Sequence, residues 1–151
     1  MTGFRIRNPD YEAEARASFA AQAMMTELGV EIEALAPGAI TLSMPFNTRF
    51  TQQHGFLHGA VPSSVLDTAC GFAAYTLMPP GSGVLTVEYK VSMLAPAKGE
   101  RFRFEGRVVK PGRTLIFTEG EAFAIAEGVE KRISTLTATM MVVTDREDVK
   151  G

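Results

Sequence analysis

The chain has 151 residues, of which 46% are hydrophobic, with a formal net charge of −2. This size and composition predict one folded domain with a substantial core rather than a disordered chain. The lack of a Lys/Arg block disfavours nucleic acid as the main partner, and a single cysteine excludes an internal disulfide. The N-terminus lacks the apolar core of a signal peptide, and no apolar run reaches the roughly 20 residues of a membrane span. We therefore expect a cytoplasmic protein.

The first predicted element is a helix over about residues 9–28. Asn8 or Asp10 can cap its start, Ala- and Met-rich sequence favours its interior, and Gly29 is expected to end it. The apolar positions follow helical spacing only loosely. The rest of the domain, about residues 30–144, is expected to form the core of the fold.

Two short strands, Val30–Ala36 and Ala39–Pro45, follow on either side of a Pro-Gly turn. A loop then leads to a second helix, Gly59–Leu77, in which nearly all residues are apolar or small. Pro62 falls in its first turn, where a backbone N–H has no intrahelical acceptor to lose. Such a composition predicts a helix that is buried on most sides.

The remaining half of the chain predicts mainly β structure. Its four long strands are Val84–Leu94, Glu100–Lys110, Thr114–Ala126 and Glu130–Val143. Because the turns between these strands are short, successive strands are expected to be antiparallel neighbours. A helix that is apolar on nearly every face must be buried on most sides, and a curved antiparallel sheet around it can bury these faces. The sequence thus predicts an α+β fold, and pairing of an open sheet edge with a second subunit would give a homodimer.

The stretch QQHGFLHGAVPSSVLD (52–67) carries both histidines of the chain and an acid within an apolar run. It resembles the pattern of hot-dog-fold, PaaI-like acyl-CoA thioesterases: an amide, a glycine, a His-Gly-Gly that opens the central helix, and an acid. The resemblance covers about residues 30–144. The matching positions are Gln52, Gly55, His58-Gly59-Ala60 and Asp67, together with Thr86 near the acid and Arg113 in KPGRTLIFTEGEAF. It implies the hot-dog fold, in which a curved antiparallel sheet wraps one long helix.

The start of the central helix is suited to binding an oxyanion. A helix N-terminus presents unpaired N–H groups and the positive end of the dipole. We expect the Gly59 N–H to be the main oxyanion donor. The Gln52 amide would be the second donor, a role that Gln53 or His54 could fill instead.

Asp67 is the expected general base or nucleophile, and the sequence does not separate these two roles. Eight residues separate Asp67 from Gly59, about 12 Å along a helix, so one chain is not expected to bring both to one carbonyl. Antiparallel helices at a dimer interface would do so, and the resemblance implies the same shared site in a homodimer. We expect the homodimers to assemble as a dimer of dimers. Apolar neighbours should raise the pKa of Asp67, whereas a Thr86 hydroxyl should favour its carboxylate.

The other expected site residues have supporting roles. His58 would position the loop or the thioester, Gly55 and Ala60 would shape the substrate site, and Arg113 would meet a CoA phosphate. No metal and no redox cofactor is expected, because coenzyme A enters as part of the substrate. The expected pocket walls are Phe56, Leu57, Phe72, Met78 and Leu85.

Other interpretations remain open at this point. Asp67 could be a structural hydrogen-bonding residue, and two histidines with one acid could on paper hold zinc, although His-x₃-His in a Gly-rich loop matches helical ligand pairs poorly. A serine hydrolase is disfavoured because the Gly-x-Ser-x-Gly elbow is absent. A hydratase is disfavoured because no histidine follows His58. The main alternative is a hot-dog module that binds or senses acyl-CoA without hydrolysing it.

Overall fold

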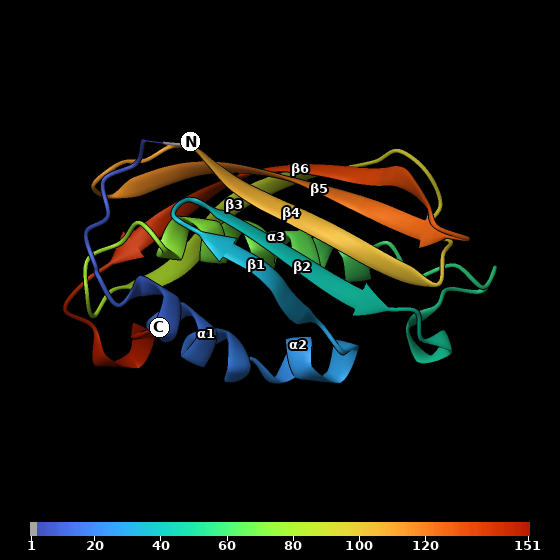
Figure 1. The fold of residues 1–151 in the computed structure, drawn as a ribbon, viewed down its shortest axis with the longest axis horizontal. Coiled ribbons are helices and arrows are strands. Elements are labelled where there is room, and N and C mark those ends of the chain that lie inside the picture. The colour runs from blue at the N-terminus through green and yellow to red at the C-terminus, as the bar shows by residue number, and fades with distance from the viewer. Residues whose placement is uncertain (1–2) are drawn as a thin grey trace.

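In a computed structural model, which describes residues 3–151, a six-stranded antiparallel sheet curves around the long helix α3 (Figure 1). The strand order is β1-β2-β4-β5-β6-β3. The predicted α+β hot-dog fold is therefore confirmed. The elements are α1 (Tyr11–Ala20), α2 (Ala23–Leu28), β1 (Glu31–Ala36), β2 (Ala39–Pro45), η1 (Thr48–Phe50), α3 (Ala60–Tyr75), β3 (Gly83–Met93), β4 (Arg101–Lys110), β5 (Leu115–Ala126), β6 (Val129–Val143) and η2 (Glu147–Val149). None of the described helices is long and apolar enough to cross a membrane.

The N-terminal helical region is broken, whereas the sequence predicted one helix over 9–28. Helix α1 ends at Ala20, and α2 begins at Ala23 after Gln22 adopts an extended conformation. Phe19 and Met25, both buried, lie six positions apart and would face different sides of a continuous helix. The break lets both enter the core. Gly29 ends the second helix in the left-handed conformation, as expected.

The strand β3 does not pair with β4, which corrects the expectation that all four long strands are successive neighbours. Instead β3 pairs with β6 at the edge of the sheet, while β4 lies between β2 and β5. The connecting segment 94–100 crosses the ends of β6 and β5. Along this path the Leu94 and Ala95 N–H groups donate to the Ile133 carbonyl at 2.8 and 3.2 Å. The later strand pairs, β4–β5 and β5–β6, are hairpin neighbours as predicted.

The helix α3 approaches the sheet most closely over a pair of glycines. Gly106 in β4 lies opposite Gly120 in β5. A β-carbon built on Gly106 would lie 2.5 Å from the backbone of Ala69, so a larger residue there would push the helix away. Phe102 and Phe104 precede Gly106 on the same face of β4, and both are fully buried. Two small positions in the sheet therefore set the depth of α3 in the core.

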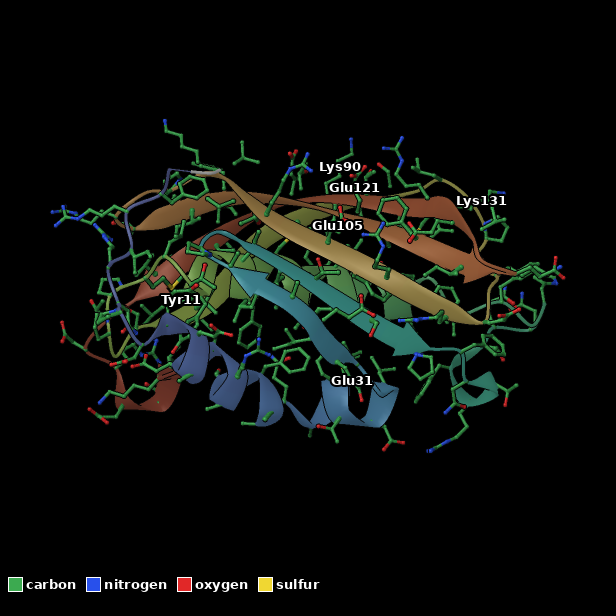
Figure 2. All side chains as sticks on the ribbon, viewed as in Figure 1. Tyr11, Glu31, Lys90, Glu105, Glu121 and Lys131 are labelled. Atoms are coloured by element: carbon green, nitrogen blue, oxygen red, sulfur yellow. The ribbon has the colours of Figure 1, made fainter. Side chains whose placement is uncertain are left out.

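The outer face of the sheet, turned away from α3, is mostly charged. Figure 2 shows Lys90, Glu105 and Glu121 on this face, and an ion-pair network joins Arg103 to Glu105 and Glu130. The end near the start of β3 differs, because it carries exposed apolar side chains on adjacent strands. This outer apolar patch consists of Leu85, Leu115, Phe117 and Met141, which are 38–45% exposed.

Candidate active site

The loop that precedes α3 is fixed by backbone hydrogen bonds. The His58 N–H donates to the Phe50 carbonyl at 2.9 Å, and the Leu57 N–H donates to the Ala97 carbonyl at 3.1 Å. These bonds tie the start of the helix to η1 on one side and to the crossing segment on the other. Gly59 is therefore held in place by structure outside the helix.

The backbone N–H of Gly59 differs from its neighbours at the helix start in its hydrogen bonding. The Ala60 N–H donates to Nδ1 of His58 at 3.0 Å, and the Val61 N–H donates to the His58 carbonyl at 2.9 Å. Within residues 3–151, by contrast, the Gly59 N–H has no acceptor. His58 thus occupies a neighbouring helix N–H and leaves the N–H of Gly59 available at the positive end of the dipole.

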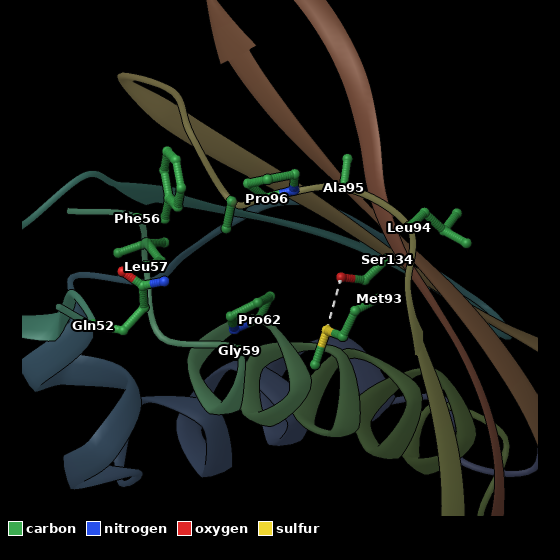
Figure 3. Close-up of a pocket in the computed structure, with 11 residues that line it drawn as sticks. Gln52, Phe56, Leu57, Gly59, Pro62, Met93, Leu94, Ala95, Pro96 and Ser134 are labelled. Atoms are coloured by element: carbon green, nitrogen blue, oxygen red, sulfur yellow. Dashed lines mark hydrogen bonds between the residues drawn. The ribbon is translucent and has the colours of Figure 1, made fainter. Parts of the chain in front are cut away.

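The side chain of Gln52 is oriented by its own turn. Its Oε1 accepts a hydrogen bond from the His54 N–H at 2.6 Å, which leaves the Nε2 amide free to donate. Gly55 makes this turn possible, because its φ of +83° is one that other residues rarely adopt. Figure 3 shows Gln52 beside Gly59 with its amide nitrogen turned toward the cavity that both residues line. Gln52 lines this cavity, whereas Gln53 and His54 do not.

The cavity beside Gly59 has a volume of about 470 Å³. Apart from Gln52 and Ser134, apolar side chains and backbone form its walls, as Figure 3 shows for Pro62, Met93 and Leu94. The Ser134 hydroxyl is turned toward the Met93 sulfur at 3.6 Å. An apolar ligand fits such a cavity, and a carbonyl oxygen of that ligand could accept hydrogen bonds from the Gly59 N–H and the Gln52 amide.

Asp67 lies eight residues farther along α3 and lines a second cavity of about 360 Å³. Its Oδ1 accepts a hydrogen bond from the Thr86 hydroxyl at 2.8 Å. Burial raises the pKa of the Asp67 carboxyl above its ordinary value, and the Thr86 hydrogen bond opposes part of that rise. The cavity also contains Ser64, Thr68 and Tyr89. The carboxylate is thus half-buried, partnered and still accessible.

A β-bulge in β3 brings Thr86 to Asp67. Thr86 pairs with Met140 and Glu88 pairs with Thr139, so Val87 is an extra residue without a partner in β6. Before the bulge, even-numbered residues such as Thr86 face α3. After the bulge, odd-numbered residues such as Tyr89 face α3. One inserted residue therefore allows both side chains to line the Asp67 side of the sheet.

The structure does not bring Gly59 and Asp67 of one chain into the same cavity. Their separation of eight residues corresponds to about 12 Å along α3, and the two cavities have no lining residue in common. Each cavity therefore holds one part of the expected machinery. The Gly59 cavity has donors but no carboxylate, and the Asp67 cavity has the carboxylate.

Several predicted site residues lie elsewhere or play other parts. Gly55 and Ala60 do not line the Gly59 cavity; Gly55 shapes the Gln52 turn, and the Ala60 N–H is taken by His58. Arg113 lies at a different pocket, formed with the N-terminal segment. Thr86 and His58 lie where the sequence placed them, next to the acid and at the helix start.

The predicted pocket walls are correct only in part. Phe56 and Leu57 line the Gly59 cavity, whereas Phe72 and Met78 belong to the core and Leu85 lies on the outer face. The end of β3 and the crossing segment, Met93 to Ala97, also form walls of this cavity, and the sequence did not predict them. These residues lie near Gly59 because β3 pairs with β6 instead of β4. This pairing joins residues far apart in the chain, so no local pattern indicates it.

The nucleophiles that might have suggested other chemistry have structural roles. Ser63 and Ser64 donate to the carbonyls of Gly59 and Ala60, one helical turn back. Cys70 is buried in the core, and burial raises the pKa of its thiol to about 12. Residues 3–151 contain no group of three or more His, Cys, Asp or Glu side chains that could hold a metal ion.

Comparison with known proteins identifies the family of this chain. The Thioesterase superfamily model matches residues 54–131, the segment from the Gln52 turn into β6. A thioesterase family protein from Silicibacter pomeroyi is 51% identical and superimposes with a TM-score of 0.88, covering 89% of this chain and 98% of that one. The Escherichia coli PaaI protein shares the fold with a TM-score of 0.79 at 17% identity, over 91% of this chain and 96% of that one.

Matches to sequence relatives are shorter. A Saccharolobus solfataricus protein named as an esterase is 36% identical over 96 residues, which span 64% of this chain and 63% of that protein. Human acyl-coenzyme A thioesterase 13 is 29% identical over 90 residues, 59% of this chain and 64% of that protein. The match therefore spans less than two thirds of each of these relatives. Together with the family model, which covers more than half of the chain, the fold and the site geometry show that this protein belongs to the Thioesterase superfamily.

Proposed function

We propose that the protein hydrolyses an acyl-CoA thioester to the free acid and coenzyme A. The observation that carries the proposal is the pairing, on one helix, of a free N–H at Gly59 with a half-buried carboxylate at Asp67. A free donor beside an apolar cavity stabilises negative charge on a carbonyl oxygen. A carboxylate with a raised pKa is a better proton acceptor than an ordinary aspartate. The name of the human relative, an acyl-coenzyme A thioesterase, supports the same substrate class.

The chemical steps follow from these groups. The thioester carbonyl oxygen accepts hydrogen bonds from the Gly59 N–H and the Gln52 amide. A water molecule attacks the carbonyl carbon while Asp67 takes its proton, and the negative charge passes to the carbonyl oxygen. Collapse of this intermediate breaks the C–S bond, and the coenzyme A thiolate leaves and takes up a proton. His58 acts as a positioning residue, because its ring holds the Ala60 N–H.

Asp67 could instead attack the carbonyl carbon directly and form an anhydride that water then cleaves. Many turnovers in ¹⁸O-labelled water distinguish the two routes. When water cleaves the anhydride at the aspartyl carbon, direct attack introduces the label into the Asp67 carboxylate, which mass spectrometry of the peptide detects. General-base catalysis places the label in the product acid alone.

We further propose that each site is shared between two chains in a homodimer. Within the described part of the chain, β3 is an edge strand that pairs with β6 alone, and its exposed apolar side chains include Val87 and Tyr89. Pairing of β3 with its copy about a two-fold axis would cover this edge and set the two α3 helices antiparallel. The Gly59 of one chain could then approach the Asp67 of the other.

The exposed side of α3 is compatible with such close helix packing. Ala60, Ser64 and Thr68 recur every four residues along this side, and all are small; Gly71, which is itself buried, follows three residues after Thr68. A β-carbon on Gly71 would meet nothing within 4 Å, so this side of the helix is open in the single chain. We expect the partner helix to fill that space.

A dimer of dimers is the larger assembly that we propose. The outer apolar patch leaves four apolar side chains exposed on the opposite face from α3, and a second dimer could cover them. Native mass spectrometry would then show a tetramer. Replacement of Phe117 by Lys is expected to reduce the tetramer to dimers with activity retained. We also propose that hydrolysis needs no metal or redox cofactor and occurs in the cytoplasm.

The experiment that tests the proposal is the release of free thiol from a panel of acyl-CoAs, from short-chain and phenylacetyl to palmitoyl. Wild type is compared with Asp67→Ala, and both are checked for the same assembly. Turnover of at least one substrate by wild type and a loss of about 10²-fold or more in Asp67→Ala support the proposal. Binding of acyl-CoA without any release of thiol would instead identify the non-catalytic binding module.

A further inference from the structure

A pocket at the end of the molecule opposite the Gly59 cavity is lined by three arginines. It has a volume of about 260 Å³ and lies between the N-terminal segment and the β4–β5 turn. The arginines are Arg5, Arg7 and Arg113, and no acidic side chain lines the pocket. We refer to it as the arginine pocket. Its uniform positive charge suits an anionic ligand.

These three arginines differ from the others in the described chain. Each of the remaining arginines forms an ion pair with a carboxylate, as Arg16 does with Glu12. Within residues 3–151, Arg5, Arg7 and Arg113 have no such partner. A single unpaired surface arginine is ordinarily hydrated and has no ligand. Three that converge on one pocket concentrate positive charge that no acidic side chain of the described residues pairs with.

The N-terminal segment is anchored on both sides of its two arginines. Before them, Phe4 packs over Gly38, where a β-carbon would lie 2.7 Å from its ring. After them, Asn8 is buried and donates through its side chain to Glu14 at 2.8 Å. Arg5 and Arg7 are thus held next to the β4–β5 turn, so an anion would not have to order a free terminus.

The arginine pocket lies at a useful distance from Asp67. Its wall includes Leu77, which follows the end of α3 and is ten residues beyond Asp67, about 15 Å at the rise of a helix. The same wall is eighteen residues, or about 27 Å, from Gly59 of its own chain. In the proposed shared site, the reacting carbonyl lies near the Asp67 of the chain that carries the arginine pocket. The distance from that carbonyl to the pocket wall is then about 15 Å rather than about 27 Å.

We infer that the arginine pocket binds the phosphate groups of coenzyme A, and that Arg5 and Arg7 act with Arg113 in this role. The inference rests on the proposed function, which supplies coenzyme A as the carrier. Coenzyme A has a pyrophosphate and a 3′-phosphate at the far end of a long pantetheine arm. Several phosphates match several guanidinium groups, which bind phosphate oxygens in a bidentate manner.

Binding of free coenzyme A to the full chain by titration calorimetry is the first test. Wild type is compared with the double variant Arg5→Gln/Arg7→Gln and with the control Arg16→Gln, which removes a paired arginine from α1. We expect roughly tenfold weaker binding of coenzyme A by the double variant and no change in the control. The difference between wild type and double variant should be smaller for 3′-dephospho-CoA, which has one phosphate fewer.

Two results of this titration would overturn the inference. Equal affinity of wild type and the double variant for coenzyme A would show that Arg5 and Arg7 do not contact it. Binding of inorganic pyrophosphate as tightly as coenzyme A, with the same sensitivity to the double variant, would show a general anion site instead.

Kinetics separate a failure of this inference from a failure of the proposed function. For an acyl-CoA that wild type hydrolyses, we expect the double variant to raise KM about tenfold with kcat unchanged. The same acyl group on pantetheine, which lacks the nucleotide, should react equally with both enzymes. An equal effect on both thioesters contradicts the inference. If no thioester is hydrolysed but coenzyme A binding depends on the arginines, the inference stands and the proposed function is wrong.

Discussion

The two cavities along α3 hold complementary chemistry. The Gly59 cavity, at the helix start, offers a free N–H and the Gln52 amide but no carboxylate. The Asp67 cavity, at the middle of the helix, offers a partnered carboxylate with a raised pKa. A cavity with donors alone can bind a carbonyl, whereas a carboxylate alone can accept a proton. One chain therefore carries both groups in separate cavities, and the proposed shared site would combine them.

The largest effect is expected from Asp67→Asn, which removes the proton acceptor and keeps the size of the side chain. We expect kcat to fall by about 10³-fold or more, because neither a base nor a nucleophile remains. Thiol release with the best acyl-CoA measures it. Asp145→Asn makes the same change at an exposed position and should leave kcat as in wild type. Equal activity of Asp67→Asn and wild type would rule out any catalytic role for Asp67.

Replacement of Gln52 by Ala tests the donor side of the comparison. Loss of one oxyanion donor typically lowers kcat by about 10²-fold, and the Gln52 amide is free to donate. Gln53→Ala, the exposed neighbour, serves as the control and should have little effect. If Gln53→Ala were the damaging change, the second donor would be assigned to the wrong residue.

Gly59→Ala should produce a smaller loss at the same place. Its new methyl group would lie 3.2 Å from the terminal carbon of Met93, a flexible side chain that can move. We expect about a tenfold decrease in kcat/KM, since the methyl narrows the cavity beside the donor while the N–H remains. Steady-state kinetics with long and short acyl groups would show a larger decrease for the longer ones.

Thr86→Val tests the environment of the carboxylate rather than its presence. The Thr86 hydrogen bond lowers the pKa of Asp67, whereas burial raises it, so removing the hydroxyl should raise the pKa further. Activity requires the carboxylate, which is lost as the pH falls through this pKa. The acid limb of kcat/KM should therefore move to higher pH in Thr86→Val. An unmoved limb would show that Asp67 does not govern the acid side of the profile.

The smallest expected effect is on stability. A folded-state pKa above the unfolded value means that the charged Asp67 destabilises the fold at neutral pH and that protonation relieves this as the pH falls. Asp67→Asn should therefore raise Tm at pH 7 by about 1–3 °C. Calorimetry should show that the difference in Tm between wild type and Asp67→Asn becomes smaller as the pH decreases. A lower Tm for Asp67→Asn than for wild type at pH 7 would show that the buried Asp67 carboxylate does not destabilise the fold.

Local sequence patterns predicted those parts of the fold that depend on neighbouring residues. The central helix, its start at Gly59 and the short strands follow from composition, Pro-Gly turns and alternation. The position of β3 beside β6 did not follow, because the choice of strand partner is made between residues far apart in the chain. Nor did the helix break at Gln22, since neither Ala21 nor Gln22 disfavours a helix locally.

The candidate site was predictable to a similar extent. The pattern around Gln52, Gly59 and Asp67 indicated the chemistry and the separation of its two parts. The bulge at Val87 that turns Thr86 toward Asp67 had no signal of its own, because a run of β-forming residues looks the same with or without an extra residue. The resemblance to a family, rather than alternation, placed Thr86 near the acid.

Complementation between two inactive chains tests most directly that Gly59 and Asp67 act across a dimer. Asp67→Asn and Gln52→Ala chains are unfolded together, refolded at equal amounts and assayed for thiol release. In a shared site, half of the dimers are mixed and each mixed dimer has one intact site, so we predict about one quarter of wild-type activity. If each chain builds its own site, refolding together would give only the mean of the two parents, and the shared site would be wrong.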